Sequence, residues 1–466
     1  MTSAPTTAPT IGTLGQLRAS GHLQKPLRTE LRDNLLDALR EDRDPWPGLH
    51  GFDETVIPQL ERAIIAGHDV VLLGERGQGK TRLLRTLVGL LDEWTPVIGG
   101  SELGEHPYEP VIHASRRRVA ELGDDLPIEW RHRDERYAEK LATPDTSVAD
   151  LIGDVDPVKV AEGRSLGDPE TIHYGLVPRA HRGIVAINEL PDLAERIQVA
   201  LLNVMEERDI QVRGYTLRLP LDVLLVASAN PEDYTNRGRI ITPLKDRFGA
   251  EVRTHYPLEL ADELAVMGQE ADLVAPVPLF LLEILARFTR SLRESSAVDQ
   301  GSGVSARFSV AAAETVAAAA LRRAALAGEP HPTARPVDLE SVPDVLRGKL
   351  EFASGEEGRE TETLTHLLRR ATADTARARL RGVDLTPLTE AVSQSPVRTG
   401  ERVAAAAVVS ALPRVAVLGD VARRLDAGGT EDPGPMAAAA ELALEYLFLT
   451  RKLAKDESDD ETVTYG

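Results

Sequence analysis

The stretch VVLLGERGQGKTRLL, residues 70 to 84, decides the fold. Its apolar start predicts a buried strand, its end begins a helical pattern, and a glycine-rich turn joins the two. The turn follows the order Gly-x-x-x-x-Gly-Lys-Thr from Gly74 to Thr81. Glycines at this spacing let backbone N–H groups curl around phosphates, and the helix N-terminus adds a favourable dipole. A chance glycine-rich turn is the alternative, but the flanking strand and helix favour a phosphate-binding loop.

The polar residues of this loop have separate expected tasks. Lys80 is expected to reach the β and γ phosphates of a nucleotide, and the Thr81 hydroxyl to ligate magnesium. The residues expected to bind the nucleotide here are Gly74, Glu75, Arg76, Gly77, Gln78, Gly79, Lys80 and Thr81.

Composition limits the classes of function. The chain has 466 residues, with 74 acidic against 54 basic side chains and a formal net charge of −20, so a broad electrostatic grip on nucleic acid is not expected. It contains no cysteine, which excludes disulfides, thiol nucleophiles and thiolate metal sites. No signal peptide or membrane span is recognisable, and we expect a cytoplasmic protein.

The pattern of apolar runs divides the chain. After a tail and helix in residues 1–45, strand-like and helical runs alternate over residues 46–255, which predicts an α/β domain with a mainly parallel sheet. Residues 256–350 are expected to form a helical lid, and residues 351–466 a further helical region with an acidic tail.

Three terminal segments carry expectations of their own. Leucines at positions 27, 31, 35 and 39 predict an amphipathic helix docked on the next domain. The opening MTSAPTTAPTIG is expected to be a disordered tail, and the closing DESDDETVTYG a solvated acidic one.

Further polar residues follow the loop at informative places. Asn230 ends the apolar run DVLLVASAN, where it can orient a water at the γ phosphate, although a turn residue before Pro231 is the plainer interpretation. Arg247 in PLKDRFG and Arg307 in SGVSARFS could each be a surface arginine. Their order after the phosphate loop favours a functional role.

Over roughly residues 46–350 the sequence resembles the AAA+ ATPases of the magnesium-chelatase I-subunit and MoxR-like group. The most specific pieces are GERGQGKT, LIGDVDP, HRGIVAINEL, ASANPED and LKDRFG. LIGDVDPVKVAEG resembles the family's insert in its second helix, and ERDIQVRGYTLRLPL resembles its hairpin before the sensor strand. The alternation of apolar residues around RGY supports a hairpin independently.

The resemblance implies roles for four residues. Glu189 would activate the attacking water, and Asn230 would sense the γ phosphate of ATP. Arg247 would be an arginine finger acting on a neighbouring subunit, and Arg307 would be the lid sensor that touches the nucleotide. A finger that acts between subunits implies a closed ring, and six subunits are usual in the family.

One position departs from the family. Asn188 stands where the family usually has an aspartate that helps to hold the magnesium shell. Its amide can accept a hydrogen bond from a magnesium-bound water but adds no charge, so we expect Asn188 in the second shell and weaker magnesium binding. Asp192 is expected to be the N-cap of the next helix rather than a substitute ligand. Because Glu189 and Arg247 are present, we expect a working, if slow, ATPase.

The resemblance leaves the task open. A remodelling motor, either magnesium-chelatase-like or a MoxR-like chaperone, is the favoured function, with an unknown client and a partner that carries a von Willebrand factor A domain. No D-x-S-x-S motif of such a domain occurs in this chain. The alternative is a nucleotide-switched scaffold with little hydrolysis because of Asn188. A transcription-activator ATPase ranks last, because the GAFTGA loop of that group is absent.

Overall fold

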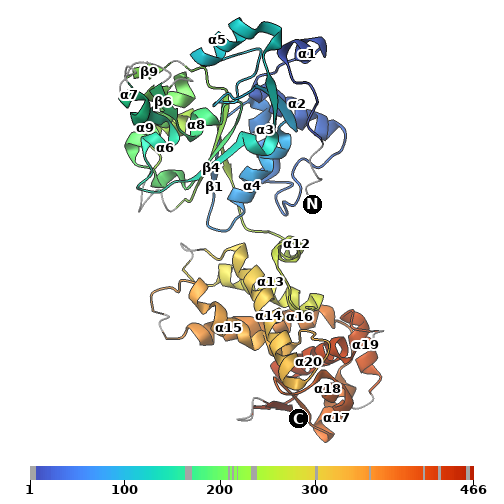
Figure 1. The fold of residues 1–466 in the computed structure, drawn as a ribbon. Helices are drawn as coiled ribbons and strands as arrows, with labels where there is room; N and C mark the ends of the chain where they lie inside the picture. Colours follow the sequence, from blue (N-terminus) through green and yellow to red (C-terminus); the bar gives the residue numbers. More distant parts are fainter. Residues whose placement is uncertain are drawn as a thin grey trace. The chain divides into compact units, whose positions relative to one another are not determined.

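The computed structural model describes residues 7–162, 171–207, 210–212, 215–217, 219–231, 239–299, 303–355, 358–412, 415–428, 432–457 and 462–466. The chain forms two compact units, residues 1–255 and residues 256–466 (Figure 1). Among the described residues we find no helix with the length and apolar character needed to cross a bilayer.

A five-stranded parallel sheet forms the centre of the first unit. Its strands are β1 (Val70–Leu73), β4 (Tyr137–Leu141), β7 (Gly183–Asn188), β10 (Val223–Ala229) and β11 (Ala250–Arg253). They lie in the order β11-β1-β10-β7-β4, and every neighbouring pair is parallel. Because β1, β10 and β7 are buried along their whole length, their sequences are continuous apolar runs. The predicted α/β domain with a mainly parallel sheet is confirmed.

Helices cover both faces of this sheet (Figure 1). One face packs on α2 (Leu27–Arg40), α3 (Val56–Ala66) and α4 (Lys80–Thr86). The other packs on α6 (Val148–Leu151), α8 (Leu176–Arg179) and α9 (Glu195–Glu207). Side chains alternate along β1, so Val70 and Leu72 enter the first core while Val71 and Leu73 enter the second.

Helix α2 docks on the sheet as the leucine spacing predicts. Leu27, Leu31 and Leu35 are buried, whereas Leu39 is 44% exposed and lies outside the contact. The buried Glu30 carboxylate accepts two hydrogen bonds from Arg136, at 2.6 and 2.8 Å. An apolar stripe and a bidentate ion pair therefore hold the helix in place.

The expected disordered tail covers residues 1–12, and the expectation is wrong for Ile11 and Gly12. Ile11 O accepts a hydrogen bond from the Trp130 indole at 2.8 Å, and Gly12 O accepts one from Ile128 N at 3.0 Å. Helix α1 (Leu14–Ala19) then buries Leu14 and Leu17. These two hydrogen bonds order the end of a segment whose composition alone indicates disorder, and residues 1–6 lie outside the described part.

Smaller elements fill the connections of the first unit. They are β2 (Trp94–Ile98), α5 (His113–Leu122), β3 (Ile128–His132), β5 (Gly153–Val155), α7 (Pro157–Ala161), β6 (Ile172–Tyr174), β8 (Ile210–Val212), β9 (Tyr215–Leu217) and α11 (Thr242–Arg247). β8 and β9 pair antiparallel, which confirms the predicted hairpin. β5 lies in the segment that resembles the family's insert, and it pairs antiparallel with β6, which follows that segment.

Helices build most of the second unit. They are α12 (Leu260–Glu270), α13 (Leu279–Glu294), α14 (Ala306–Ala327), α15 (Ser341–Leu346), α16 (Glu360–Arg379), α17 (Thr386–Gln394), α18 (Ala405–Ala411), α19 (Val417–Arg424) and α20 (Pro433–Leu449). One hydrophobic core runs through this unit from Met267 to Tyr465. The division of the unit at residue 350 into a lid and a further region stays a prediction.

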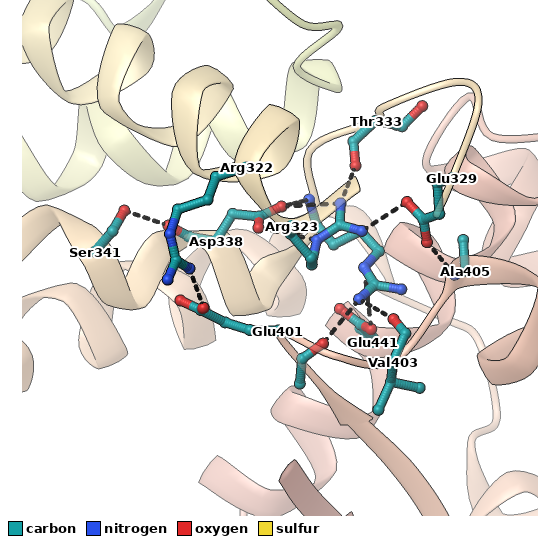
Figure 2. A network of polar contacts seen from close by, with 12 residues as sticks. Arg322, Arg323, Glu329, Thr333, Asp338, Ser341, Glu401, Val403, Ala405 and Glu441 are labelled. Atoms are coloured by element: carbon teal, nitrogen blue, oxygen red, sulfur yellow. Dashed lines mark hydrogen bonds and ion pairs between the residues drawn. The ribbon is translucent and has the colours of Figure 1, made fainter. Parts of the chain in front are cut away.

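A buried ionic network lies inside this helical unit (Figure 2). Arg323 donates to Asp338 at 3.0 Å and to Glu329 at 2.9 Å, and Arg335 forms an ion pair with Glu441 at 3.5 Å. Burial raises the pKa of Asp338 and of Glu441, although the arginines oppose that effect. The network joins α14, the segment after it and α20.

The expectation that the closing acidic segment is a solvated tail is wrong for its described residues. β13 (Lys455–Glu457) and β14 (Thr462–Tyr465) join β12 (Val397–Gly400) in a three-stranded sheet. Val463 and Tyr465 are buried, because their alternation with threonines gives the strand one apolar face. The acidic composition of the tail conceals that alternation.

Candidate nucleotide site

The glycine-rich loop between β1 and α4 has positions that favour glycine. A Cβ atom on Gly74 would lie 1.9 Å from Thr254 Oγ1 and 2.3 Å from Gln78 Oε1, so a larger residue would force these two side chains to move. Gly77 and Gly79 have φ angles of 75° and 77°, a conformation that favours glycine. The buried Gln78 carbonyl accepts hydrogen bonds from Thr254 Oγ1 at 2.8 Å and from the Glu75 backbone N–H at 3.1 Å. Bonds to the Gln78 side chain thus brace the loop from within.

Lys80 begins α4 and is only 6% exposed. Its ammonium group donates to Gly74 O, to Glu75 O at 2.8 Å and to Asn230 Oδ1 at 2.7 Å. Oxygen atoms of the loop and of Asn230 therefore surround the Lys80 ammonium group.

Asn230 links this lysine to Glu189. Asn230 follows β10 directly, and its Nδ2 donates to Glu189 Oε2 at 2.9 Å. Glu189 follows β7 with φ 54° and ψ 49°, a left-handed conformation that is uncommon for a non-glycine residue. The carboxyl ends of β1, β10 and β7 thus bring Lys80, Asn230 and Glu189 together at one sheet edge, where ligands of α/β proteins bind.

Asn188 uses both ends of its amide. Its Nδ2 donates to Glu139 Oε1 at 2.7 Å, and its Oδ1 accepts from Ser228 Oγ at 3.2 Å. Ser228 Oγ also accepts a hydrogen bond from the Glu189 backbone N–H at 3.2 Å. Asn188 is buried, with 7% of its surface exposed. Its orientation is therefore fixed by its neighbours.

Glu139 and Arg85 are among the site residues that the sequence did not indicate. Arg85 of α4 donates to Glu139 Oε2 at 2.8 Å and to Oε1 at 3.0 Å, and the Tyr137 hydroxyl adds a bond to Oε2 at 3.2 Å. The hydrogen bonds from Arg85 are the main cause that lowers the pKa of Glu139, so its carboxylate is charged at neutral pH. A glutamate inside YAEKL gives no local signal, because its role depends on β4 lying beside β7.

These hydrogen bonds form a continuous chain that starts and ends on α4. It runs from Lys80 through Asn230 to Glu189, and from there through Ser228 and Asn188 to Glu139 and Arg85. Thr81 lies one turn before Arg85 on the same side of α4. This chain of hydrogen bonds connects the helix that follows the phosphate loop to the neighbouring strands β10, β7 and β4.

The three predicted arginines are exposed. Arg247 is the last residue of α11 and forms an ion pair with Glu206 of α9, with side chains 45% and 40% exposed. Arg76 is exposed in the loop, and Arg307 is exposed at the start of α14 in the second unit. The N-cap expected at Asp192 is wrong, because Asp192 ends a 3-10 helix and α9 begins only at Glu195.

Comparisons with known proteins find sequence similarity to subunits of magnesium chelatase. It is 28% identical over 245 residues to the magnesium-chelatase subunit ChlI of Nostoc sp., covering 51% of this chain and 61% of that protein. It is 30% identical over 236 residues to the chloroplastic ChlI of Nicotiana tabacum, covering 49% of this chain and 52% of that protein. The chain therefore spans between about half and three fifths of these relatives.

Residues 163–247 match the family model described as the Sigma-54 interaction domain. Among solved structures, NtrX from Brucella abortus is 14% identical with a TM-score of 0.38, covering 77% of this chain and 69% of that chain. A likeness at that score supports no statement about function. The sequence similarities confirm the predicted resemblance to the magnesium-chelatase I-subunit group of AAA+ ATPases.

Proposed function

We propose that this chain, which is similar to magnesium-chelatase subunits over about half of its length, binds ATP with magnesium and hydrolyses it to drive the remodelling of another protein complex. The observation that carries the proposal is the contact of Asn230 with both Lys80 and Glu189, at 2.7 and 2.9 Å. One amide at the strand edge thus joins the cation expected at the phosphates to the carboxylate expected at the water.

The residues present fit a nucleoside triphosphate. The N-terminus of α4 and the backbone N–H groups of Gly77 and Gly79 suit an anion, and Lys80 supplies a point charge. They also fit magnesium, because the Thr81 hydroxyl oxygen is a ligand of the kind that a hard cation takes, and the Asn188 carbonyl oxygen can accept a hydrogen bond from a magnesium-bound water. Bound magnesium would neutralise charge on the phosphates.

Hydrolysis needs a water aligned with the bond between the β and γ phosphates. Glu189 accepts a hydrogen bond from that water and takes its proton, while Asn230 orients it. Attack on phosphorus forms a new P–O bond as the bond to ADP breaks, which gives ADP and phosphate. Lys80 stabilises the charge that develops on the phosphoryl oxygens.

Arg247 and Arg307 extend the proposal to an assembly. Arg247 is half-exposed, so a neighbouring subunit can receive its guanidinium as a finger, and Arg307 acts as the lid sensor. Action between subunits requires a closed ring, which we propose is a hexamer. A partner with a von Willebrand factor A domain and a client complex complete the motor, either in metal loading or as a MoxR-like chaperone.

Asn188 favours one alternative, a scaffold that switches shape with ATP but hydrolyses little. The match of residues 163–247 to the Sigma-54 interaction domain favours another, a transcription activator. The sequence lacks the GAFTGA loop that such activators use, so this alternative stays last.

Glu189→Gln tests the proposal. Replacing the carboxylate by its amide should leave binding of a fluorescent ATP analogue within about twofold and lower steady-state phosphate release by roughly 10² to 10⁴. Glu207→Gln, which changes an exposed carboxylate at the end of α9, serves as the matched control and should behave as wild type. Phosphate release equal in wild type and Glu189→Gln would refute Glu189 as the water-activating residue.

A further inference from the structure

We propose that Glu139 is the positioning residue that determines the chemistry of position 188, so that an amide works there and a carboxylate does not. Asn188 Nδ2 donates to Glu139 Oε1 at 2.7 Å, and the two residues lie on neighbouring parallel strands. The departure at position 188 is then not a loss but half of a matched pair.

The carboxylate of Glu139 has no acceptor position to spare. Oε1 receives Arg85 and Asn188, and Oε2 receives Arg85 and Tyr137. A carboxylate has about four lone-pair positions, and these four bonds use them. Every neighbour of Glu139 in this set is a donor, so the site selects a donor at position 188.

An ionised aspartate at position 188 has no hydrogen to donate, so its carboxylate would face the Glu139 carboxylate without a hydrogen bond between them. Both groups are largely shielded from water, since Asn188 is 7% exposed and the Glu139 side chain 21% exposed. Like charges at such a distance repel strongly in a partly buried setting. Arg85 already donates to both oxygens of Glu139, so it can offset only part of the repulsion.

The same pairing decides what Asn188 offers to the nucleotide site. With Nδ2 committed to Glu139 and Ser228 Oγ bonded to Oδ1, the amide cannot turn over without losing both bonds. The carbonyl oxygen is left with one further lone pair for a water of the magnesium shell. This last step rests on the proposed function, whereas the pairing itself does not.

A double-mutant cycle tests the pair in the full-length protein. The variants are Asn188→Asp, Glu139→Gln and the two combined. In the combined variant the glutamine at position 139 can donate its amide to the aspartate at position 188, so the two positions exchange roles. Glu121→Gln, which changes an exposed glutamate on α5, is the matched control for loss of one carboxylate. Two readouts are measured: the thermal midpoint without nucleotide, and the MgCl₂ concentration for half-maximal binding of a fluorescent ATP analogue.

Asn188→Asp alone should lower the thermal midpoint by several degrees and give no gain in magnesium affinity. The double variant should recover most of the midpoint and lower the half-maximal MgCl₂ concentration about tenfold below wild type, because its carboxylate is then free of a like charge. The proposal would be overturned if the double variant were no more stable than Asn188→Asp. It would also be overturned if Asn188→Asp changed the half-maximal MgCl₂ concentration equally in the presence of Glu139 and in the Glu139→Gln background. If wild type binds no analogue, the proposed function fails, and the midpoints alone then decide the pairing.

Discussion

Replacing Arg247 by alanine gives a sharp test of action between subunits. In the isolated chain this arginine pairs with Glu206, and the two side chains are 45% and 40% exposed. Such a surface pair contributes about 0 to 1 kcal/mol to stability, so Arg247→Ala should fold with a nearly unchanged thermal midpoint. A finger, by contrast, accelerates phosphoryl transfer by roughly 10³ to 10⁵. That is about 4 to 7 kcal/mol of transition-state stabilisation, well beyond the contribution of the pair to folding.

Two measurements separate these effects. Arg247→Ala should bind a fluorescent ATP analogue within about threefold of wild type while its phosphate release falls by at least about 10²-fold. Glu206→Gln breaks the same ion pair but keeps the arginine, so it is the matched control and should retain hydrolysis. Loss of hydrolysis in Glu206→Gln equal to that in Arg247→Ala would assign the effect to the ion pair instead.

Mixing inactive variants tests the direction of action. Arg247→Ala subunits keep Glu189, and Glu189→Gln subunits keep Arg247, so some interfaces of a mixed ring are complete. In a random equal mixture roughly a quarter of the interfaces pair an intact Glu189 with a neighbour's Arg247. Phosphate release should therefore recover to about that fraction of wild type. No recovery in a mixture shown to exchange subunits would refute action in trans.

Single groups give three further predictions. Lys80→Ala should weaken binding of a fluorescent ATP analogue by at least about 10- to 100-fold, since a charge-assisted bond contributes about 1.5–3 kcal/mol; undiminished binding would contradict the loop assignment. Burial lowers the pKa of His106 to about 2 and of His181 to about 3 from 6.5, so both stay neutral when folded while the unfolded chain takes up protons below pH 6.5. Their contribution to the free energy of unfolding is full above pH 6.5 and is lost as pH falls, by about 3 kcal/mol per histidine at pH 4.5, which urea unfolding above pH 6.5 and at pH 4.5 measures; equal stability would contradict burial of the neutral forms. Glu30→Ala leaves the buried Arg136 without its carboxylate and should lower the free energy of unfolding by about 3–5 kcal/mol in urea, whereas a loss below about 1 kcal/mol would mean that the pair does not hold α2.

Local sequence patterns predicted the secondary-structure elements that depend on short-range interactions. The strand before Gly74 and the helix after Lys80 follow from apolar periodicity, and the hairpin of β8 and β9 from alternation around a turn. The positions of Glu189 and Asn230 at strand ends could also be predicted, because parallel strands present their carboxyl ends at one edge.

The rest depends on contacts between distant segments. Glu139 lies 49 residues before Asn188 and meets it only because β4 is the neighbour of β7. β14 pairs with β12, which lies far away in the sequence. The local sequence therefore showed only the acidic residues before β14, and these indicate a solvated tail. Strand order and long-range pairing are not encoded in the periodicity of a single segment.

We propose that this chain hydrolyses ATP repeatedly although it has Asn188 where the family usually has a carboxylate. The most direct measurement counts phosphate released per chain by purified full-length protein in excess ATP and MgCl₂, with Glu189→Gln as background. Phosphate release should continue linearly well past one phosphate per chain. Release that stops at or below one phosphate per chain, with nucleotide still bound, would contradict it and establish a nucleotide-switched scaffold.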